Sequence, residues 1–243
     1  MFAGGAGFSG GPQFVFASED GALSTWGSGS KAAAQADLSA SGTVFKGLAI
    51  APSGGSTYLY ATDFHNARVA VFNTSFQPAN LAGSFADPGI PAGFAPFGIQ
   101  AIAGNLYVTY ARQRAPENHD DSAGVGNGFV DVFRPDGTLL RRPASGGNLN
   151  SPWGLALAPA GFGPYGGDIL VGNFGDGAIG VYDPNTGGYV GRLMDTAGNP
   201  LVIPGLWALS FGNGAGAGGT GILYFTSGPG GEKHGLFGSL QPK

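Results

Sequence analysis

The chain contains no cysteine, and that absence excludes disulfide bonds, thiol catalysis and zinc sites built on thiolates. Charged residues make up only 11% of the sequence and form no basic stripe, so nucleic-acid binding is not expected. No run of about 18 or more apolar residues occurs, so no membrane span is expected either. Residues 1–11 show neither the basic start nor the apolar core of a signal peptide, and the sequence leaves the localisation open.

Glycine and proline are abundant, with 48 and 17 residues in a chain of 243. A hydrophobic content of 42%, with 12% aromatic residues, is enough to build a core and argues against a disordered chain. The glycines and prolines therefore indicate turns between many short strands. A length of roughly 200–250 residues is normal for one all-β domain, so residues 1–243 are expected to form a single domain.

An internal repeat gives the first specific prediction of the fold. Apolar runs that contain a glycine recur at intervals of 51, 56 and 54 residues, measured from Gly47 to Gly98, Gly98 to Gly154, and Trp153 to Trp207. Repeats of this length are typical of β-propellers, whose blades are four-stranded antiparallel sheets. A β-sandwich is the alternative all-β fold, but it does not explain the period.

The expected strands are rich in Val, Ile, Tyr and Phe and are bounded by turn residues. Within the repeats, second strands are predicted at 58–62, 106–110, 169–173 and 222–226, third strands at 68–72, 128–133 and 178–182, and outer strands at 80–85, 138–142 and 189–194. An irregular first unit has strands at 14–18, 22–26 and 32–38, and the last unit ends with one at 236–240. Residues 2–8 supply either the first strand of the first unit or a strand that closes another blade. The sequence thus predicts a β-propeller of about five blades.

Residues 150–163, 171–177, 205–214 and 232–238 carry a resemblance to a known family. They are similar to an uncharacterised family of mostly exported bacterial β-propeller proteins, some of which carry a C-terminal sorting tail. The resemblance implies the propeller fold and relatives that are extracellular or periplasmic, but no established reaction. Family members usually begin with an export signal and about one more blade, so about six blades are expected in the relatives. This chain resembles a form shortened at its N-terminus.

The loops between second and third strands hold most of the candidate functional residues. All three histidines lie in loops of this class, and each stands two residues from a carboxylate: Asp63 with His65, His119 with Asp121, and Glu232 with His234. These six residues are the candidate catalytic groups. Imidazole and carboxylate together suit zinc or manganese, and carboxylate with carbonyl oxygen suits calcium. A divalent metal is therefore a candidate cofactor, with Asp63, His65, Glu232 and His234 as its candidate ligands.

The same residues also have a simpler interpretation, and the sequence leaves both open. Acidic residues, asparagine and glycine are the ordinary residues of tight turns and of loop hydrogen bonding. No short metal-binding signature occurs in the chain. The metal assignment therefore depends on the loops converging in the folded protein.

A second group of candidates stands at or near the inner strands. Phe97, Trp153 and Trp207 occupy equivalent positions in the repeat and either fill the space between sheets or line a ligand site. Lys46 stands just before the corresponding inner strand and is a candidate ligand-binding cation. Asn173, at the end of a second strand, completes the candidate ligand-binding set.

Two functional hypotheses follow, and whether the chain is an enzyme is left open. The first is a binding protein that presents a propeller face to a small molecule, a glycan or a protein partner. The second is a metal-assisted hydrolase or lyase that uses the carboxylates and histidines around the centre of the propeller. Association of identical chains through exposed blade edges is a further possibility.

Overall fold

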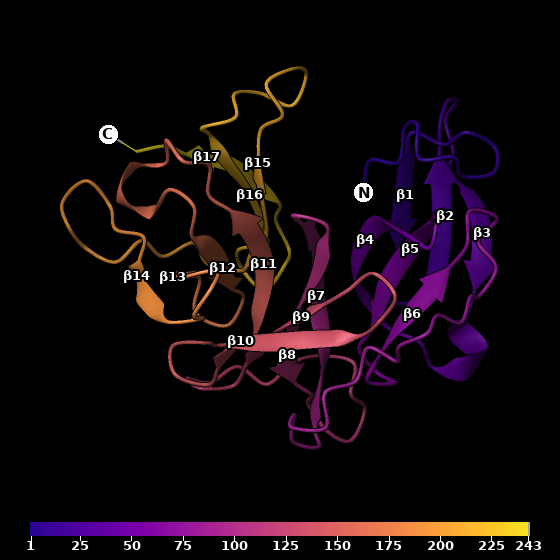
Figure 1. Ribbon diagram of the computed structural model, residues 1–243, viewed down its shortest axis with the longest axis horizontal. Coiled ribbons are helices and arrows are strands. Elements are labelled where there is room, and N and C mark those ends of the chain that lie inside the picture. Colours follow the sequence, from indigo (N-terminus) through magenta and orange to yellow (C-terminus); the bar gives the residue numbers. More distant parts are fainter. Residues whose placement is uncertain (243) are drawn as a thin grey trace. The chain divides into compact units, whose positions relative to one another are not determined.

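The computed structural model describes residues 1–242, and strands make up nearly all of its regular structure (Figure 1). In chain order the strands are β1 (Phe14–Ala17), β2 (Ala22–Trp26), β3 (Ala33–Asp37), β4 (Phe45–Ser53), β5 (Ser56–Asp63), β6 (Arg68–Phe72), β7 (Phe94–Ile102), β8 (Asn105–Arg112), β9 (Phe129–Phe133), β10 (Leu139–Ser145), β11 (Pro152–Leu157), β12 (Ile169–Asn173), β13 (Ile179–Tyr182), β14 (Tyr189–Arg192), β15 (Leu206–Phe211), β16 (Leu223–Ser227) and β17 (Leu236–Leu240). Within these residues the helical elements are two short 3-10 turns, η1 (Ser39–Ser41) and η2 (Gly163–Tyr165). Neither has the length or apolar character that a membrane-crossing helix requires.

The strands form five antiparallel sheets that follow one another along the chain. The sheets are β1-β2-β3, β4-β5-β6, β10-β9-β8-β7, β11-β12-β13-β14 and β15-β16-β17. Each sheet pairs strands that are consecutive in sequence, as short connections favour. The all-β class and the five repeated sheets predicted from the sequence are confirmed.

Three of the five sheets have three strands. In the last sheet, β15-β16-β17, this matches the three strands predicted there, but the sheet β4-β5-β6 lacks its predicted fourth strand. The outer strand expected at 80–85 does not form. In that segment the backbone N–H groups of Gly83 and Phe85 donate to the carbonyls of Asp136 and Gly137, at 2.7 and 3.0 Å, instead of to β6. Residues 2–8 likewise form no strand, and only an isolated bridge joins Phe2 to Phe14 of β1.

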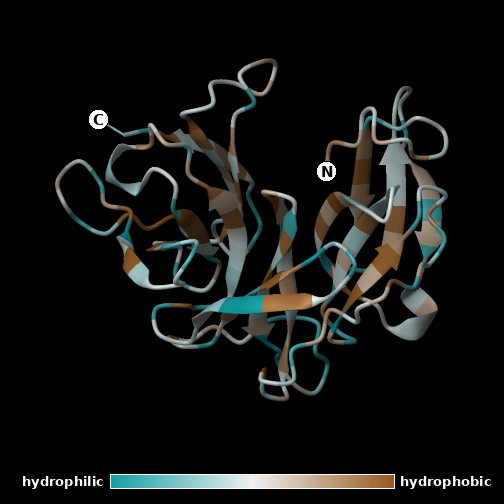
Figure 2. Ribbon diagram, viewed as in Figure 1, coloured by the Kyte–Doolittle hydropathy of each residue, from teal (hydrophilic) through white to brown (hydrophobic). Residues whose placement is uncertain are grey.

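The chain divides into two compact units, and each has its own hydrophobic core. Unit 1 comprises residues 1–108, 112–121 and 131–141, and unit 2 comprises residues 109–111, 122–130 and 142–243. The core of unit 1 includes Val15, Leu23, Phe45, Leu59 and Phe72. The core of unit 2 includes Leu170, Ile179, Val181, Leu206 and Leu223. Figure 2 shows the hydrophobic colour mainly on strands, while many of the loops are pale or hydrophilic.

The repeated glycine of the inner strands has a steric cause. A Cβ atom on Gly47 of β4 would lie 3.1 Å from the backbone nitrogen of Ile99 in β7. A Cβ atom on Gly154 of β11 would lie only 2.4 Å from the carbonyl oxygen of Trp207 in β15. Neighbouring inner strands therefore approach so closely that a side chain does not fit at Gly154 and would be tightly packed at Gly47.

Candidate functional site

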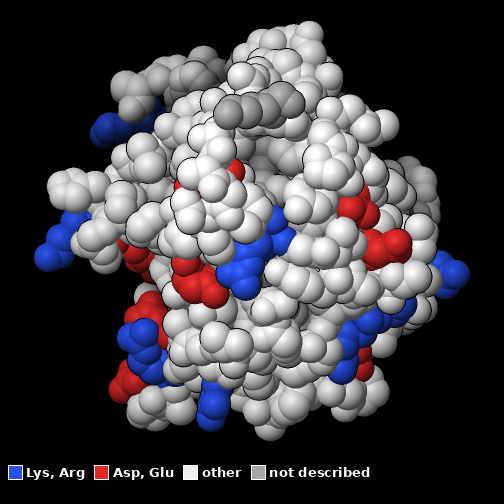
Figure 3. Space-filling model, turned by 90° about the vertical axis from the view of Figure 1, so that its left-hand side faces the viewer, with Lys and Arg blue, Asp and Glu red and all other residues white. Residues whose placement is uncertain are grey.

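Five ionisable side chains of unit 1, from two loops and one strand, lie close together and are called the loop cluster below. They are Glu19 of the β1–β2 turn, Lys46 of β4, and Arg114, His119 and Asp120 of the β8–β9 loop. Charged residues are scarce in this protein, with 11 Lys and Arg and 15 Asp and Glu. On the face drawn in Figure 3 the charged side chains stand in small groups, some with blue and red atoms side by side, within a mainly neutral surface. A gathering of five within one unit is therefore unusual for this chain.

Lys46 is the centre of the loop cluster. Its side chain is only 10% exposed, although the residue carries a positive charge. Its ammonium group forms an ion pair with Glu19 and lies 3.8 Å from Oδ1 of Asp120. A charge removed from water requires partners of opposite sign, and these two carboxylates supply them.

His119 lies between the same two carboxylates. Its Nδ1 is 3.1 Å from Oδ1 of Asp120, and its Nε2 is 3.9 Å from Oε2 of Glu19. Arg114 adds a second cation, with its NH1 nitrogen 3.7 Å from Oδ2 of Asp120. The hydrogen bond with His119, helped by the charges of Lys46 and Arg114, holds the pKa of the Asp120 carboxyl below its usual value.

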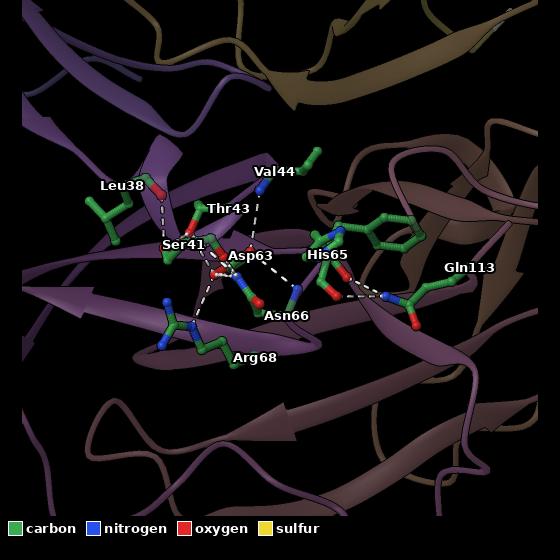
Figure 4. A network of polar contacts seen from close by, with 10 residues as sticks. Leu38, Ser41, Thr43, Val44, Asp63, His65, Asn66, Arg68 and Gln113 are labelled. Atoms are coloured by element: carbon green, nitrogen blue, oxygen red, sulfur yellow. Dashed lines mark hydrogen bonds and ion pairs between the residues drawn. The ribbon is translucent and has the colours of Figure 1, made fainter. Parts of the chain in front are cut away.

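The β8–β9 loop is fixed by contacts to the β5–β6 turn, as Figure 4 shows in part. The side-chain amide of Gln113 donates to the carbonyls of Phe64 and His65, at 2.6 and 3.1 Å. The Nδ1–H of His65 donates to the carbonyl of Glu117 at 2.9 Å. His65 thus holds the loop in place, and the loop in turn places His119 and Asp120 beside Lys46.

Asp63, the partner of His65 in the sequence-based metal hypothesis, has a structural environment. Its side chain is fully buried and accepts hydrogen bonds from the Thr43 hydroxyl at 3.1 Å and the Val44 N–H at 3.3 Å. The Asn66 amide at 2.9 Å and the Arg68 Nε at 3.0 Å bind the same carboxylate (Figure 4). These donors occupy both oxygens, so the described contacts tie Asp63 to its own sheet.

Asn173 repeats this arrangement in unit 2. It stands at the end of β12, as Asp63 stands at the end of β5. Its side-chain oxygen accepts from the backbone N–H of Asn150 at 3.1 Å, and its nitrogen donates to the carbonyl of Asn148 at 2.9 Å. A polar residue at the end of the second strand therefore fixes the segment that leads into the first strand, in at least two sheets.

The remaining predicted site residues do not join the loop cluster. Asp121 is buried at the base of the β8–β9 loop, where its carbonyl accepts from Arg114 at 3.0 Å. Phe97 is buried in unit 1 against the ring of Phe64, with centroids 5.1 Å apart. The other four belong to unit 2, where Trp153 is partly buried, Trp207 is 41% exposed, and Glu232 and His234 are exposed on the β16–β17 loop.

The structure brings together some residues that the sequence did not single out. Arg114 and Gln113 carried no signal, because a lone arginine or glutamine in a loop has no motif. Asp120, which binds His119, stands next to the predicted partner Asp121. Glu19 lay in the expected class of loop, but its pairing with Lys46 joins residues 27 positions apart and depends on the folded sheets.

Among residues 1–242, no three or more His, Asp or Glu side chains are arranged to hold a metal ion. The metal hypothesis and the metal-assisted hydrolase that depends on it stay predictions. The loop cluster offers alternating donors and acceptors instead. That arrangement suits hydrogen bonding to a ligand.

Comparisons with known proteins agree with the fold. No family model matches the chain. Two uncharacterized proteins of Acanthamoeba polyphaga mimivirus are each 38% identical to it, over 173 and 176 residues. These matches cover 69% of this chain but only 41% and 44% of the two relatives, so the chain spans less than half their length. The resemblance to exported bacterial proteins stays a prediction, since these relatives are viral.

Solved structures of β-propeller type are similar to the chain. A gluconolactonase from Xanthomonas campestris has a TM-score of 0.56 and 17% identity over 94% of this chain and 82% of its own. The Dos1 propeller has a TM-score of 0.50 and 10% identity over 90% of this chain and 50% of its own. At such low identity the likeness concerns the fold alone. The predicted β-propeller fold is confirmed.

Proposed function

We propose that this chain is a propeller-fold binding protein, and that the loop cluster holds a small, neutral, hydroxyl-rich molecule such as a sugar. The observation that carries the proposal is Lys46, a nearly buried ammonium group held between two carboxylates of two different loops. Such a group is costly to maintain, and clusters of this kind are concentrated at functional sites.

The charge balance of the loop cluster favours a neutral ligand. Glu19 and Asp120 contribute two negative charges, and Lys46 and Arg114 contribute two positive charges. A balanced site gives no net attraction to an anion or a cation. Hydroxyl groups can both donate and accept, so they suit a surface where carboxylate acceptors alternate with cationic donors.

The accessibility of the loop cluster also supports this proposal. The side chains of Glu19, His119 and Asp120 are each about half exposed, whereas Lys46 is almost covered. The outer groups can therefore reach a ligand, while Lys46 fixes their positions. Preorganised polar groups of this kind lower the entropic cost of binding.

The test is calorimetric titration of the purified chain with a panel of neutral mono- and disaccharides, sugar phosphates and amino sugars. The Lys46→Met variant keeps most of the buried volume but removes the charge. We expect it to weaken binding of the neutral ligand by about tenfold or more. Without the Lys46 charge, Glu19 and Asp120 are no longer held in position, and their hydrogen bonds to the ligand are lost.

The matched control is Lys31→Met, because Lys31 is an exposed lysine of unit 1 outside the loop cluster. This variant should bind as the unsubstituted chain does. Binding that favours the sugar phosphates, or that is equal in the two lysine variants, contradicts the proposal.

A further inference from the structure

The outer edge of β6 is open over most of its length. β6 is the last strand of the sheet β4-β5-β6, and its residues pair with β5 on one side only. On the other side, the backbone hydrogen bonds within residues 1–242 are confined to its C-terminal end, where Ala79 N–H donates to the Val71 carbonyl at 2.8 Å. An open edge of this kind presents a row of unpaired backbone groups.

The unpaired groups belong to Val69 and Val71. In an antiparallel pair, alternate residues direct both their N–H and C=O groups to the same side. Because the Val71 carbonyl points to Ala79, the N–H groups of Val69 and Val71 and the Val69 carbonyl also point away from β5. Within residues 1–242 no backbone hydrogen bond to these three groups is formed.

A groove lies beside this edge. Its volume is about 530 Å³, and Leu38, Val69, Val71 and Leu81 are among the residues that line it. Another wall includes residues 79–85, which contain the predicted outer strand but do not pair along β6, so the position of a fourth strand beside β6 is left open. The bonds of Gly83 and Phe85 to the Asp136–Gly137 turn hold that wall in place, so the gap is a fixed feature of unit 1.

Arg68 gives the groove a charge preference. It is the only charged residue among those that line the groove. Its Nε is bound to Asp63 at 3.0 Å, but its side chain is 51% exposed. The two terminal nitrogens have no hydrogen-bond partner within the described residues and suit a carboxylate.

We propose that this groove binds an extended peptide segment of a partner protein, which adds to β6 as the fourth strand and places an acidic side chain on Arg68. The mode is β-strand addition, in which backbone hydrogen bonds give affinity and side-chain pockets give specificity. A cavity of this size also suits a drug-sized molecule, but the row of backbone donors and acceptors matches an extended chain. This surface is distinct from the loop cluster.

The test uses fluorescence anisotropy with the full chain and a labelled pentapeptide, Thr-Val-Thr-Val-Asp. Two N-methylated forms of the peptide act as ligand-side controls, each methylated along one of its two backbone edges. Only one of the two edges can pair with β6, so only one of the two forms loses these hydrogen bonds. We expect saturable binding of the parent peptide and a loss of about fivefold or more for only one of the two methylated forms.

A protein variant tests the charge contact. Arg68→Gln should weaken binding of the peptide that ends in aspartate by about tenfold and leave binding of the version ending in asparagine nearly unchanged. Arg192→Gln, at an exposed arginine of unit 2, is the matched control and should leave both unchanged.

Three outcomes overturn the proposal. They are no binding at millimolar peptide, equal effects of the two methylation patterns, and a groove blocked by a second copy of this chain. The last would appear as a dimer in light scattering that the Leu81→Asp variant converts to monomer.

Discussion

At the scale of single residues, burial separates the polar groups that build the fold from those that face solvent. Asp63 and His65 stand two positions apart in the sequence, and together they suggested a metal site. In the structure Asp63 is fully buried among donors of its own sheet, whereas His65 donates to the β8–β9 loop. The sequence alone does not separate these two roles. Two of the donors to Asp63, the Thr43 hydroxyl and the Val44 N–H, precede β4 and meet Asp63 only in the folded sheet.

Removal of the Asp63 carboxylate should destabilise the protein strongly. Asp63→Ala leaves the Thr43 hydroxyl, the Val44 N–H and the Arg68 guanidinium without their partner. The expected loss in the free energy of unfolding is about 3 kcal/mol, because the buried Thr43 hydroxyl and Val44 N–H each lose their acceptor. Urea denaturation measures it.

The comparison variant is Asp63→Asn, which keeps one acceptor oxygen and should cost clearly less. Equal stability of Asp63→Ala and the unsubstituted chain would refute the structural role given to this residue.

The lowered pKa of Asp120 predicts a pH dependence. A carboxyl whose folded-state pKa is below its unfolded value, about 3.9, stabilises the fold above that pH. The contribution is lost as the pH falls through the lower folded-state pKa. The effect on stability is small because the side chain is half exposed.

A carbon-detected NMR titration of the carboxyl groups tests the cause of this shift. His119→Ala should raise the pKa of Asp120 toward the usual aspartate value. Asp37, whose pKa is lowered by hydrogen bonds from Ser39, should not respond. An unchanged Asp120 midpoint in the variant would mean that His119 does not hold that pKa down.

At the scale of elements, runs rich in Val, Ile, Tyr and Phe between turn residues predicted most strands well. The strands expected at 22–26, 68–72 and 236–240 match β2, β6 and β17 residue for residue. The strand expected at 80–85 is absent for a tertiary reason. The ring of Phe85 packs 5.6 Å from that of Tyr60 and 5.4 Å from that of Phe133, and this draws the segment away from β6. No local pattern in the sequence encodes such a contact.

The repeated glycine, by contrast, was visible in the sequence, and its steric role is testable. Gly154→Ala places a Cβ atom against the Trp207 carbonyl at the close approach of β11 and β15. We expect a loss of about 1–3 kcal/mol in the free energy of unfolding, the usual range for overpacking.

Gly161→Ala is the matched control, because a Cβ atom there meets nothing within 4 Å. It should be neutral or slightly stabilising, by about 0.4–1 kcal/mol at most. Comparable losses in the two variants would contradict close packing at Gly154.

At the scale of the whole molecule, we propose that residues 1–243 unfold as one domain. The boundary between the two compact units falls inside β8, β9 and β10, each of which has residues in both units. Neither unit can keep these strands intact when the other unfolds, so a single cooperative transition is expected.

Tryptophan fluorescence can follow the units separately, since Trp26 belongs to unit 1 and Trp153 and Trp207 belong to unit 2. Variants that keep only Trp26, or only the other two, should show the same urea midpoint. Two separate midpoints would show independent domains.

Association of identical chains through open sheet edges also stays a prediction. β17 is an edge strand whose Leu236 and Phe237 are 48% and 69% exposed. Light scattering over a range of concentrations should reveal a dimer that Phe237→Ser weakens. A monomer at every concentration would exclude this route.

The central claim is that the loop cluster around Lys46 binds a neutral, hydroxyl-rich molecule, and NMR of the three histidine rings tests it most directly. His119 lies in the loop cluster, His65 binds the β8–β9 loop that carries His119, and His234 belongs to unit 2. During titration with the neutral sugars, the account predicts that the His119 resonances shift most and that those of His234 stay in place. Shifts of His234 with an unmoved His119, or no shift at any sugar concentration, would contradict it.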